Sequence, residues 1–418
     1  MNILHINCTD LVGGRFTGYY MQESLDKSDN VEMAVWDRTT KSAHVYRLPP
    51  SNAALRFLAT NAMRFGNRVG LDALIGFGGW VLPSRDYFKR ADVVHLHLIH
   101  NNANLSILSL PKLARLKPVV WTVHDPWAMT GGCEHSFDCE RWLTGCAPRC
   151  PHPRRRSLFQ HYTPYLHWRI KKWVYQRSDL TLIVASQWMQ DRIGRSPLLS
   201  HLPCHRIPFG IDLQVFKPRS KMECRQKLGI PLDHKVIAFR DVGLEHDRFK
   251  GLRWLMEALK IYMPQGPTSL LIFQDGKGFQ CLSPKYNIVA TGWIDGEELA
   301  GALSAADVFM MPSIQEAFGL MAVEAMACGV PVIVFEGTSL PGVIKSPRGG
   351  LAVPARDSVA LAGALKRLLD NDDLRNELGA NARQIAEDEY AFPLYVQRHI
   401  RLYKEVIERH ERDHCYER

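Results

Sequence analysis

The feature that most constrains the fold is an alternation of short apolar runs with longer helical patterns. Five such runs, rich in Val, Ile and Leu, lie in the first half of the chain, at residues 2–7, 31–36, 91–99, 118–125 and 180–186. Apolar runs of this length are typical of strands buried on both faces, and intervening helices favour parallel pairing. A helix is expected from about Thr17, directly after the first strand and its turn. The pattern therefore predicts a parallel sheet with crossover helices.

A second series of the same kind begins near residue 235. Its expected strands lie at residues 235–243, 269–276, 286–293, 307–313 and 330–337, and its expected helices at 252–262, 296–306, 318–329, 358–370 and 374–390. Between the two series, residues 207–220 carry Gly and Pro without periodicity, which is typical of a linker. A chain of 418 residues also favours two domains over one core.

We therefore predict an α/β protein with two Rossmann-like, doubly wound parallel-sheet domains. The first would cover residues 1–208, and the second would cover residues 209–385. A basic helix within residues 386–418 is expected to return to the first domain. Open parallel sheets bind ligands outside the carboxyl ends of their strands, so the expected binding site is a cleft between the two sheets.

Composition narrows the class of protein. Hydrophobic residues make up 46% and charged residues 23% of the chain, which favours a globular protein over a disordered or fibrous one. No apolar run approaches the 18 residues of a membrane-spanning helix, and the N-terminus lacks the basic region of a signal peptide. We expect a cytoplasmic protein, whose thiols stay reduced.

The net charge of +9 resides in one segment. Residues 141–178 contain nine Lys or Arg and no Asp or Glu, interleaved with Tyr165, Trp168, Trp173 and Tyr175. Such a mixture suits the headgroup region of an anionic membrane surface, at which the protein would be peripheral. The alternatives are a solvated basic face whose rings point into the core, and a nucleic-acid site.

Four cysteines follow closely on one another, at Cys133, Cys139, Cys146 and Cys150. In a reducing compartment this density indicates a tetrahedral thiolate zinc site, which would be structural because no coordination position stays open. Free thiols are one alternative, and two disulfides are another if the compartment is oxidising.

Three short motifs lie at expected strand ends. Gly13 and Gly14 fit a loop whose backbone approaches a phosphate or sugar, although the absence of a complete GxGxxG disfavours a nicotinamide enzyme. His124 fits either a structural role or a general acid or base. Lys250 precedes an expected helix start, where a bound anion would favour a cation that otherwise is merely solvated.

Residues 312–334, "PSIQEAFGLMAVEAMACGVPVIV", hold two carboxylates in an otherwise small and apolar stretch. Glu316 lies in an expected loop, and Glu324 lies eight residues later on an expected helix, with no Lys or Arg in the stretch. Buried carboxylates are costly unless they are satisfied, so both are predicted to meet a ligand. The alternative is two solvated surface glutamates.

Taken together, these motifs resemble the retaining glycosyltransferases of family 4, which have the GT-B fold. The strongest similarity is the E-x7-E pattern formed by Glu316 and Glu324 within residues 291–337, and "IPFGID", "FKG" and "WTVHD" occur in the expected order. The similarity covers nearly the whole chain. The cysteine pattern after "WTVHDPWAMTGG" further resembles a subgroup of bacterial surface polysaccharide enzymes, such as those of colanic acid synthesis.

The resemblance implies hexosyl transfer, with retention, from a nucleotide diphosphate sugar to a glycan or lipid-linked glycan, without a cofactor in catalysis. It implies synthesis of exopolysaccharide, capsule or lipopolysaccharide. The implied roles are donor-sugar contact by Glu316, backbone amides from Phe318, Gly319 and Leu320, ribose contact by Glu324, diphosphate contact by Lys250, a diphosphate border at Gly14, and His124 near the reacting sugar.

Two positions depart from the pattern of that family. Leu244 stands where an Arg commonly completes the grip on the diphosphate, with Arg240 and Arg248 nearby, and Phe209 stands where Asn is frequent. Two other functions are compatible with parts of the chain: a sugar-nucleotide epimerase on the GT-B fold, and a zinc-bearing nucleic-acid-binding protein. The second lacks any recognised nucleic-acid module. The nucleotide, sugar and acceptor are not specified by these motifs.

Overall fold

A computed structural model of the chain describes residues 1–11, 14, 16–24, 29–49, 52–69, 71, 74–100, 105–146, 150, 158–241, 243 and 249–415. The chain divides into two compact units. Unit 1 comprises Met1–Ile207 and Val396–Arg418, and unit 2 comprises Pro208–Tyr395. The sequence predicted that the second domain would begin at residue 209 and end at residue 385. In the structure, unit 2 begins at Pro208 and ends at Tyr395.

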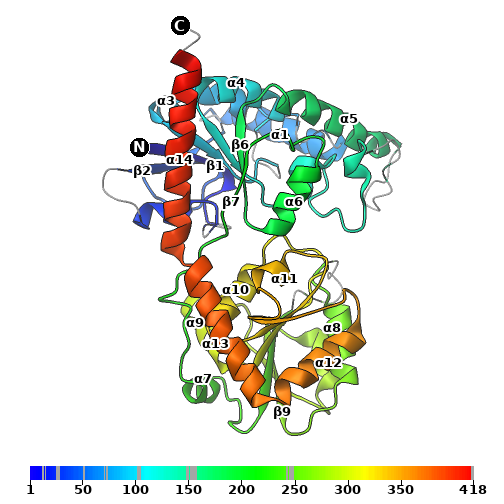
Figure 1. The fold of residues 1–418 in the computed structure, drawn as a ribbon. Helices are drawn as coiled ribbons and strands as arrows, with labels where there is room; N and C mark the ends of the chain where they lie inside the picture. Colours follow the sequence, from blue (N-terminus) through cyan, green and yellow to red (C-terminus); the bar gives the residue numbers. More distant parts are fainter. Residues whose placement is uncertain are drawn as a thin grey trace. The chain divides into compact units, whose positions relative to one another are not determined.

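Unit 1 contains a seven-stranded sheet within the described residues (Figure 1). Its strands are β1 (Asn2–Thr9), β2 (Asn30–Asp37), β3 (Val45–Arg47), β4 (Val93–Leu96), β5 (Val119–Thr122), β6 (Leu180–Val184) and β7 (Cys204–Arg206). All neighbours pair in parallel, in the order β3-β2-β1-β4-β5-β6-β7. The order reverses between β1 and β4, and such a switch point is where doubly wound sheets bind ligands.

Helices connect these strands. The α-helices of unit 1 are α1 (Ala53–Val69), α2 (Gly78–Val81), α3 (Asp86–Arg90), α4 (Leu110–Leu116), α5 (Leu158–Tyr175) and α6 (Gln187–Arg195). Short 3-10 helices are η1 (Tyr19–Ser24), η2 (Leu82–Ser84), η3 (Ile107–Ser109), η4 (Pro126–Met129) and η5 (Arg141–Leu143). In the described residues that follow Thr17, the 3-10 helix η1 stands in place of the expected α-helix. None of the described helices is long and apolar enough to cross a bilayer.

Unit 2 repeats the same topology with six strands in the described residues. They are β8 (Lys235–Arg240), β9 (Thr268–Phe273), β10 (Asn287–Ala290), β11 (Val308–Met311), β12 (Val332–Phe335) and β13 (Gly350–Val353). Their order is β10-β9-β8-β11-β12-β13, again with parallel neighbours only. The switch point of this sheet lies between β8 and β11.

Helices cover both faces of the second sheet (Figure 1). They are α7 (Lys221–Lys227), α8 (Leu252–Ile261), α9 (Gly296–Ala305), α10 (Leu320–Ala327), α11 (Leu340–Val343), α12 (Ser358–Leu369) and α13 (Asp372–Glu389), with the 3-10 helix η6 (Lys277–Leu282). On α8, Leu252, Leu255, Met256 and Leu259 recur at helical spacing and are buried in a core that includes α12. The last helix, α14 (Phe392–Cys415), starts in unit 2 and continues in unit 1.

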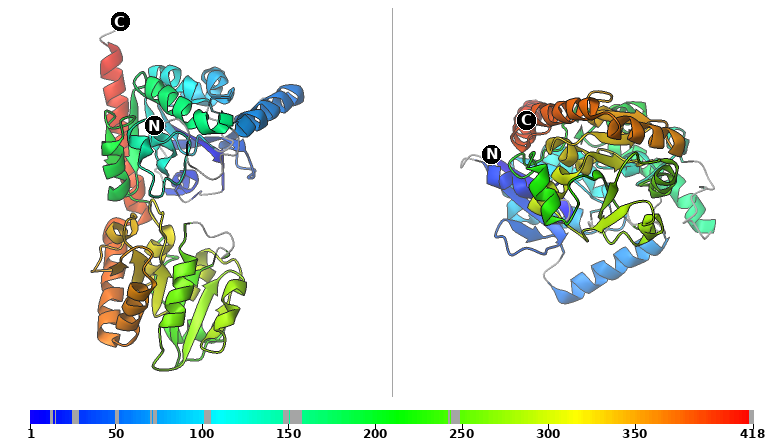
Figure 2. Two further views of the ribbon diagram at one scale, coloured as in Figure 1. Left: turned by 90° about the vertical axis from the view of Figure 1, so that its right-hand side faces the viewer. Right: turned by 90° about the horizontal axis from the view of Figure 1, so that it is seen from below.

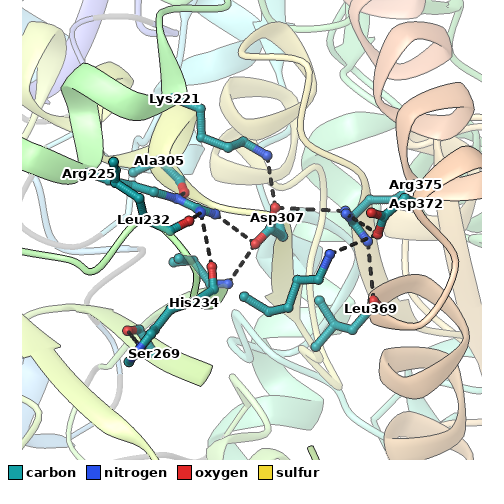
Figure 3. A network of polar contacts seen from close by, with 12 residues as sticks. Lys221, Arg225, Leu232, His234, Ser269, Ala305, Asp307, Leu369, Asp372 and Arg375 are labelled. Atoms are coloured by element: carbon teal, nitrogen blue, oxygen red, sulfur yellow. Dashed lines mark hydrogen bonds and ion pairs between the residues drawn. The ribbon is translucent and has the colours of Figure 1, made fainter. Parts of the chain in front are cut away.

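A buried ion-pair network holds the amino ends of β8 and β11 together (Figure 3). Asp307 accepts hydrogen bonds from Arg225 (2.8 Å), Lys221 (2.9 Å) and the backbone N–H of Val236 (2.7 Å). Burial opposes ionisation of Asp307, but the two cations outweigh it and hold the pKa of this carboxyl below its ordinary value. The network lies at the opposite end of the strands from the loops that carry Lys250 and Glu316, so its role is structural.

Candidate functional site

Two loops meet at the carboxyl edge of the unit 2 sheet. Because β8 and β11 are neighbours, the loops that follow them lie side by side, and the Ile314 N–H donates to the Phe249 carbonyl over 2.8 Å. Gly251 has a φ of 77°, and a Cβ atom there would lie 1.9 Å from the Pro312 carbonyl oxygen. Only glycine fits this approach, which places Lys250 against the loop after β11.

Lys250 and Glu316 form an ion pair across these loops. Lys250 Nζ lies 2.6 Å from Glu316 Oε2, and the two side chains are 30% and 17% exposed. The stretch at residues 312–334 contains no Lys or Arg. The partner of Glu316 is Lys250, which lies 66 residues earlier in the chain. The structure thus brings together two residues that were predicted to contact the diphosphate and the donor sugar.

The turn that follows Glu316 ends at the start of α10. Gly319 has a φ of 95°, and a Cβ atom there would lie 2.4 Å from Leu340 Cδ2. Gly319 provides no side-chain cap, so the N–H groups of Leu320 and Met321 lack an intrahelical acceptor, whereas the Ala322 N–H donates to the Gly319 carbonyl over 3.0 Å. Such amides suit an anion.

The Phe318 side chain anchors this turn in the core. Its ring packs edge-on against Phe209 at 5.0 Å and Tyr390 at 5.7 Å, measured between ring centroids. Phe209, which departs from the family pattern, therefore has a packing role in this chain. Only the backbone of Phe318 remains available for the predicted donor contact.

Glu324 lies on α10 and is fully buried. Glu316 is mostly buried as well, so the alternative of two solvated surface glutamates is wrong. Ribose binding by Glu324 stays a prediction.

The expected diphosphate contact would take a second cation besides Lys250. Leu244 and Arg248 lie outside the described residues. Arg240 ends β8, where it donates to the Ile294 carbonyl over 3.2 Å, and its guanidinium carbon lies 4.4 Å from the centre of the Trp293 ring. Arg240 is thus held by the loop after β10.

In unit 1, the loop after β1 is tightly packed. The N–H of Gly14 donates to the Leu11 carbonyl over 2.9 Å, and a Cβ atom on Gly14 would lie 3.1 Å from a ring carbon of Tyr20. Gly13 lies outside the described residues. Asp10 fixes the start of the loop by accepting hydrogen bonds from the backbone and hydroxyl groups of Thr39 and Thr40.

His124 lies just beyond β5, and its Nε2 is 3.2 Å from Nδ1 of His97. The neighbouring Asp125 pairs with His100 (3.1 Å) and caps η4 through the Trp127 N–H (2.7 Å). Burial, only partly offset by Asp125, lowers the pKa of His124 to about 4. His124 is therefore neutral near pH 7.

Sequence reasoning missed a cluster of buried histidines at the switch point of unit 1. His5 on β1 is in register with His95 on β4, and His97 lies two residues beyond His95 on the same face. Possible ligand atoms of His5, His95 and His97 lie within 4.8 Å of one another, the only such group of three among the described residues. The His-x-His alternation was the available signal.

Apart from His5 Nε2, the ring nitrogens of this cluster already have hydrogen-bond partners. His95 Nδ1 lies 2.6 Å from the Tyr403 hydroxyl, and His95 Nε2 lies 2.7 Å from Thr122 Oγ1. His5 Nδ1 and His97 Nε2 lie 2.7 Å apart. Binding a metal ion would require several of these bonds to break, so the geometry fits a hydrogen-bonded core better than a metal centre.

The four clustered cysteines are not joined by disulfides. Among the described residues their sulfurs do not form a group within 4.8 Å. Cys146 accepts a hydrogen bond from the Gly131 N–H, and burial raises the pKa of its thiol to about 11. The alternative of two disulfides is therefore wrong. The structural zinc site stays a prediction.

The basic segment has two kinds of side chain on α5. Trp168 and Tyr175 are buried, as is Lys171, which donates to the carbonyls of Trp127 and Thr130. Tyr165 and Trp173, in contrast, are 38% and 50% exposed. The core-facing interpretation thus holds for two rings and fails for the other two. Arg154, Arg155 and Arg156 lie outside the described residues.

Comparisons with known proteins relate the chain to glycosyltransferases. Residues 238–371 match the family described as "Glycosyl transferases group 1", and residues 56–215 match "Glycosyltransferase Family 4". Each match covers less than half of the chain, and both are to glycosyltransferases. The fold of the chain is GT-B, because it is similar to the structure of Anabaena HepE in complex with UDP and glucose. That likeness has a TM-score of 0.65 at 15% identity, over 97% of this chain and 100% of the other.

Curated proteins similar to this chain are also named as glycosyltransferases. A D-inositol 3-phosphate glycosyltransferase of Corynebacterium jeikeium is 32% identical over 50% of this chain and 53% of its own length. An MMP alpha-(1->4)-mannosyltransferase of Mycolicibacterium hassiacum is 28% identical over 75% of this chain and 71% of its own length. The chain thus spans about half the length of the first relative. These names do not favour an epimerase or a nucleic-acid-binding protein.

Proposed function

We propose that the protein transfers a hexosyl group from a nucleotide diphosphate sugar to an acceptor hydroxyl, with retention of configuration. The bond between the anomeric carbon and the diphosphate breaks, a bond to the acceptor oxygen forms, and the acceptor loses its proton. The observation that carries this proposal is the Lys250–Glu316 pair at the switch point of unit 2, next to the glycine-capped start of α10.

The residues of this site suit the charge that develops on the leaving diphosphate. Lys250 and the first amides of α10 supply positive potential. Glu316 accepts hydrogen bonds from sugar hydroxyls once Lys250 turns to the phosphates, and Glu324 binds the ribose. In unit 1, Gly13 and Gly14 border the diphosphate, and His124 contacts the reacting sugar.

A donor screen tests this function. Sugars linked to uridine, guanosine or adenosine diphosphate are added, and the unfolding temperature is measured; a ligand at about 100 times its Kd stabilises the native state by about 2.7 kcal/mol. We expect one nucleotide class to raise the unfolding temperature of the wild type and to raise that of Lys250→Met much less. Absence of both a thermal shift and sugar transfer for every donor would rule the function out.

For the acceptor, we propose a lipid-linked glycan of bacterial surface polysaccharide synthesis, met at the cytoplasmic face of an anionic membrane. The exposed rings of α5 support this proposal. The guanidinium carbons of Arg169 and Arg177 lie 6.0 Å and 4.7 Å from the ring centres of Tyr165 and Trp173. Exposed aromatic rings beside Arg side chains are typical of membrane interfaces.

Helix α1 supports the same proposal independently. Phe57, Leu58 and Phe65 are at least 60% exposed, and α1 contains three Arg and no Asp or Glu. Leu58 and Phe65, seven residues apart, share one side of the helix, and Arg64 and Arg68 lie on its exposed face. Figure 2 shows α1 extending away from the unit 1 sheet. An exposed face of aromatic, aliphatic and Arg side chains suits an anionic bilayer surface.

A further inference from the structure

The Lys250–Glu316 ion pair joins two side chains that the proposed function assigns to different parts of one donor. Lys250 is to contact the diphosphate, and Glu316 is to contact the sugar hydroxyls. In the structure, Lys250 Nζ lies 2.6 Å from Glu316 Oε2. An ammonium group that kept this contact and also bound a phosphate would bring two like charges close together. Binding of a diphosphate therefore competes with the ion pair.

Glu316 depends on Lys250 for its charge balance. Among the described residues, no other side chain or backbone N–H donates to the Glu316 carboxylate. Its side chain is 17% exposed, so water reaches only a small part of it. The Ser339 N–H donates to the Glu316 carbonyl over 3.2 Å, which fixes the main chain of this residue. Loss of Lys250 would thus leave a mostly buried carboxylate without a cation, which is unfavourable.

A free nucleoside diphosphate would take both sources of positive potential in this site. One is the Lys250 ammonium, and the other is the start of α10, where the N–H groups of Leu320 and Met321 lack an intrahelical acceptor. Glu316 would then keep neither of them and would also face a second anion. The nucleoside diphosphate therefore binds at the expense of the carboxylate.

An intact donor replaces what the carboxylate loses. Its sugar carries hydroxyl groups, which can donate to Glu316 while the diphosphate takes Lys250. Hydrogen bonds to a charged acceptor are stronger than those between neutral groups. Only a ligand with both a diphosphate and sugar hydroxyls therefore satisfies both side chains after the ion pair has opened.

We infer that the ion pair makes Glu316 a specificity-determining residue, which favours the intact donor over the nucleoside diphosphate product. This inference rests on the proposed function and adds discrimination against the product to it. Sugar transfer converts a ligand that satisfies both residues into one that satisfies Lys250 alone. Formation of the Lys250–Glu316 pair then competes with the product and favours its release.

Binding measurements with Glu316→Gln test the inference. Isothermal titration gives the Kd of UDP, GDP and ADP, each compared with UDP-glucose, GDP-mannose or ADP-glucose. Gln has the shape of Glu and still accepts a hydrogen bond, but it neither pairs with Lys250 nor repels a diphosphate. We expect the Kd of the bound nucleoside diphosphate to fall about tenfold, because no charge is left unpaired. The Kd of its sugar ester should change less than about threefold, which corresponds to about 0.7 kcal/mol.

Glu387→Gln is the matched control for the loss of one negative charge. Glu387 lies on α13 of the same unit, where Arg383 Nε is 2.6 Å from its Oε1. We expect this variant to keep the wild-type Kd for both kinds of ligand. The inference is overturned if Glu316→Gln leaves the Kd of the nucleoside diphosphate unchanged or raises it. It is also overturned if the control gains as much affinity as Glu316→Gln.

A double-mutant cycle separates the ion pair from simple repulsion. In the Lys250→Met background the pair is absent, so Glu316→Gln should improve binding of the nucleoside diphosphate clearly less than it does in the wild type. Equal improvement in both backgrounds would show that Glu316 acts without Lys250 and would overturn the inference.

The failure of the proposed function gives a different result. If the wild type binds nucleotides but transfers no sugar, the proposed function fails, and the ratio of the two Kd values still decides the inference. If the wild type binds none of the six ligands, the proposed function and the inference both fail.

Discussion

At the scale of single residues, the Lys250–Glu316 pair distinguishes function from stability. Both side chains reach solvent, so the pair stabilises the folded state by at most about 1 kcal/mol. We therefore expect Lys250→Met to change the free energy of unfolding by less than about 1 kcal/mol. Loss of a cation at the leaving diphosphate is expected to lower kcat about 100-fold.

Turnover assays and urea unfolding measure the two effects. Lys277→Met is the matched control, because Lys277 pairs with Asp275 on the surface of the same unit. We expect this control to keep wild-type turnover. Wild-type turnover in Lys250→Met itself would remove Lys250 from the proposed mechanism.

Gly319 offers a residue-scale test of the turn that starts α10. Its φ of 95° and the nearby Leu340 side chain exclude a Cβ atom without strain. We expect Gly319→Ala to lower the free energy of unfolding by about 1–2 kcal/mol. Gly301→Ala, within α9 and with nothing within 4 Å of the added Cβ, should instead stabilise the protein by about 0.5–1 kcal/mol. Equal effects of both changes in urea unfolding would contradict the geometry of the turn.

At the scale of elements, α1 and α5 can be tested as membrane contacts. Burial of one aromatic ring contributes about 1.5–3 kcal/mol, which corresponds to at least about tenfold in affinity. Phe57→Ser with Phe65→Ser, or Trp173→Ser, should weaken binding to phosphatidylglycerol-containing vesicles by that factor or more. Cosedimentation measures this binding, with pure phosphatidylcholine vesicles for comparison.

Met263→Ser provides the control, because Met263 is an exposed apolar side chain of unit 2. Its binding to the vesicles should equal that of the wild type. Wild-type binding by the α1 and α5 variants would contradict the membrane proposal. Equal loss in the control would indicate a general effect of exposed apolar side chains.

The sequence predicted those elements whose stability comes from long apolar runs. Ten expected strands correspond to ten strands of the two sheets, whereas β3, β7 and β13 were missed. Each of the three is at a sheet edge and spans at most four residues, so it leaves little periodic signal. The α-helix expected from about Thr17 was also wrong, because the described residues there form the 3-10 helix η1.

The candidate site was predictable residue by residue but not as an arrangement. Lys250 and Glu316 were each identified from local patterns, but their contact depends on β8 and β11 being neighbours. His5 and His97 are 92 residues apart and were not singled out at all. Contacts of this kind follow from strand order, which a single sequence specifies only weakly.

At the scale of the whole molecule, the buried histidines make stability depend on pH. The pKa of His5, His95, His97 and His124 is lowered, mainly by burial. Below about pH 6.5 the unfolded chain binds protons that these folded rings do not, so stability falls as the pH falls. Each such ring contributes about 1.4 kcal/mol per pH unit.

Unit 2 should respond to acid later than unit 1. Because the pKa of Asp307 is lowered, its ionised side chain contributes fully to the free energy of unfolding above the ordinary carboxyl range. That contribution is lost only below about pH 4. Between about pH 6.5 and about pH 4.5 we thus expect unit 1 to open first. Hydrogen exchange of peptides from β4 and β5, compared with β8 and β11, measures this order. Equal loss of protection in both units would contradict it.

The course of α14 has a consequence for synthesis. The unit 1 sheet ends with β7, yet Tyr403, the partner of His95, belongs to a helix that follows all of unit 2. A ribosome adds about 5–20 residues per second, so roughly 10–40 s separate the synthesis of β7 from the synthesis of Tyr403. During that interval the nascent first unit holds a buried imidazole whose partner is not yet made. Unit 1 can therefore complete its fold only after α14 has been synthesised.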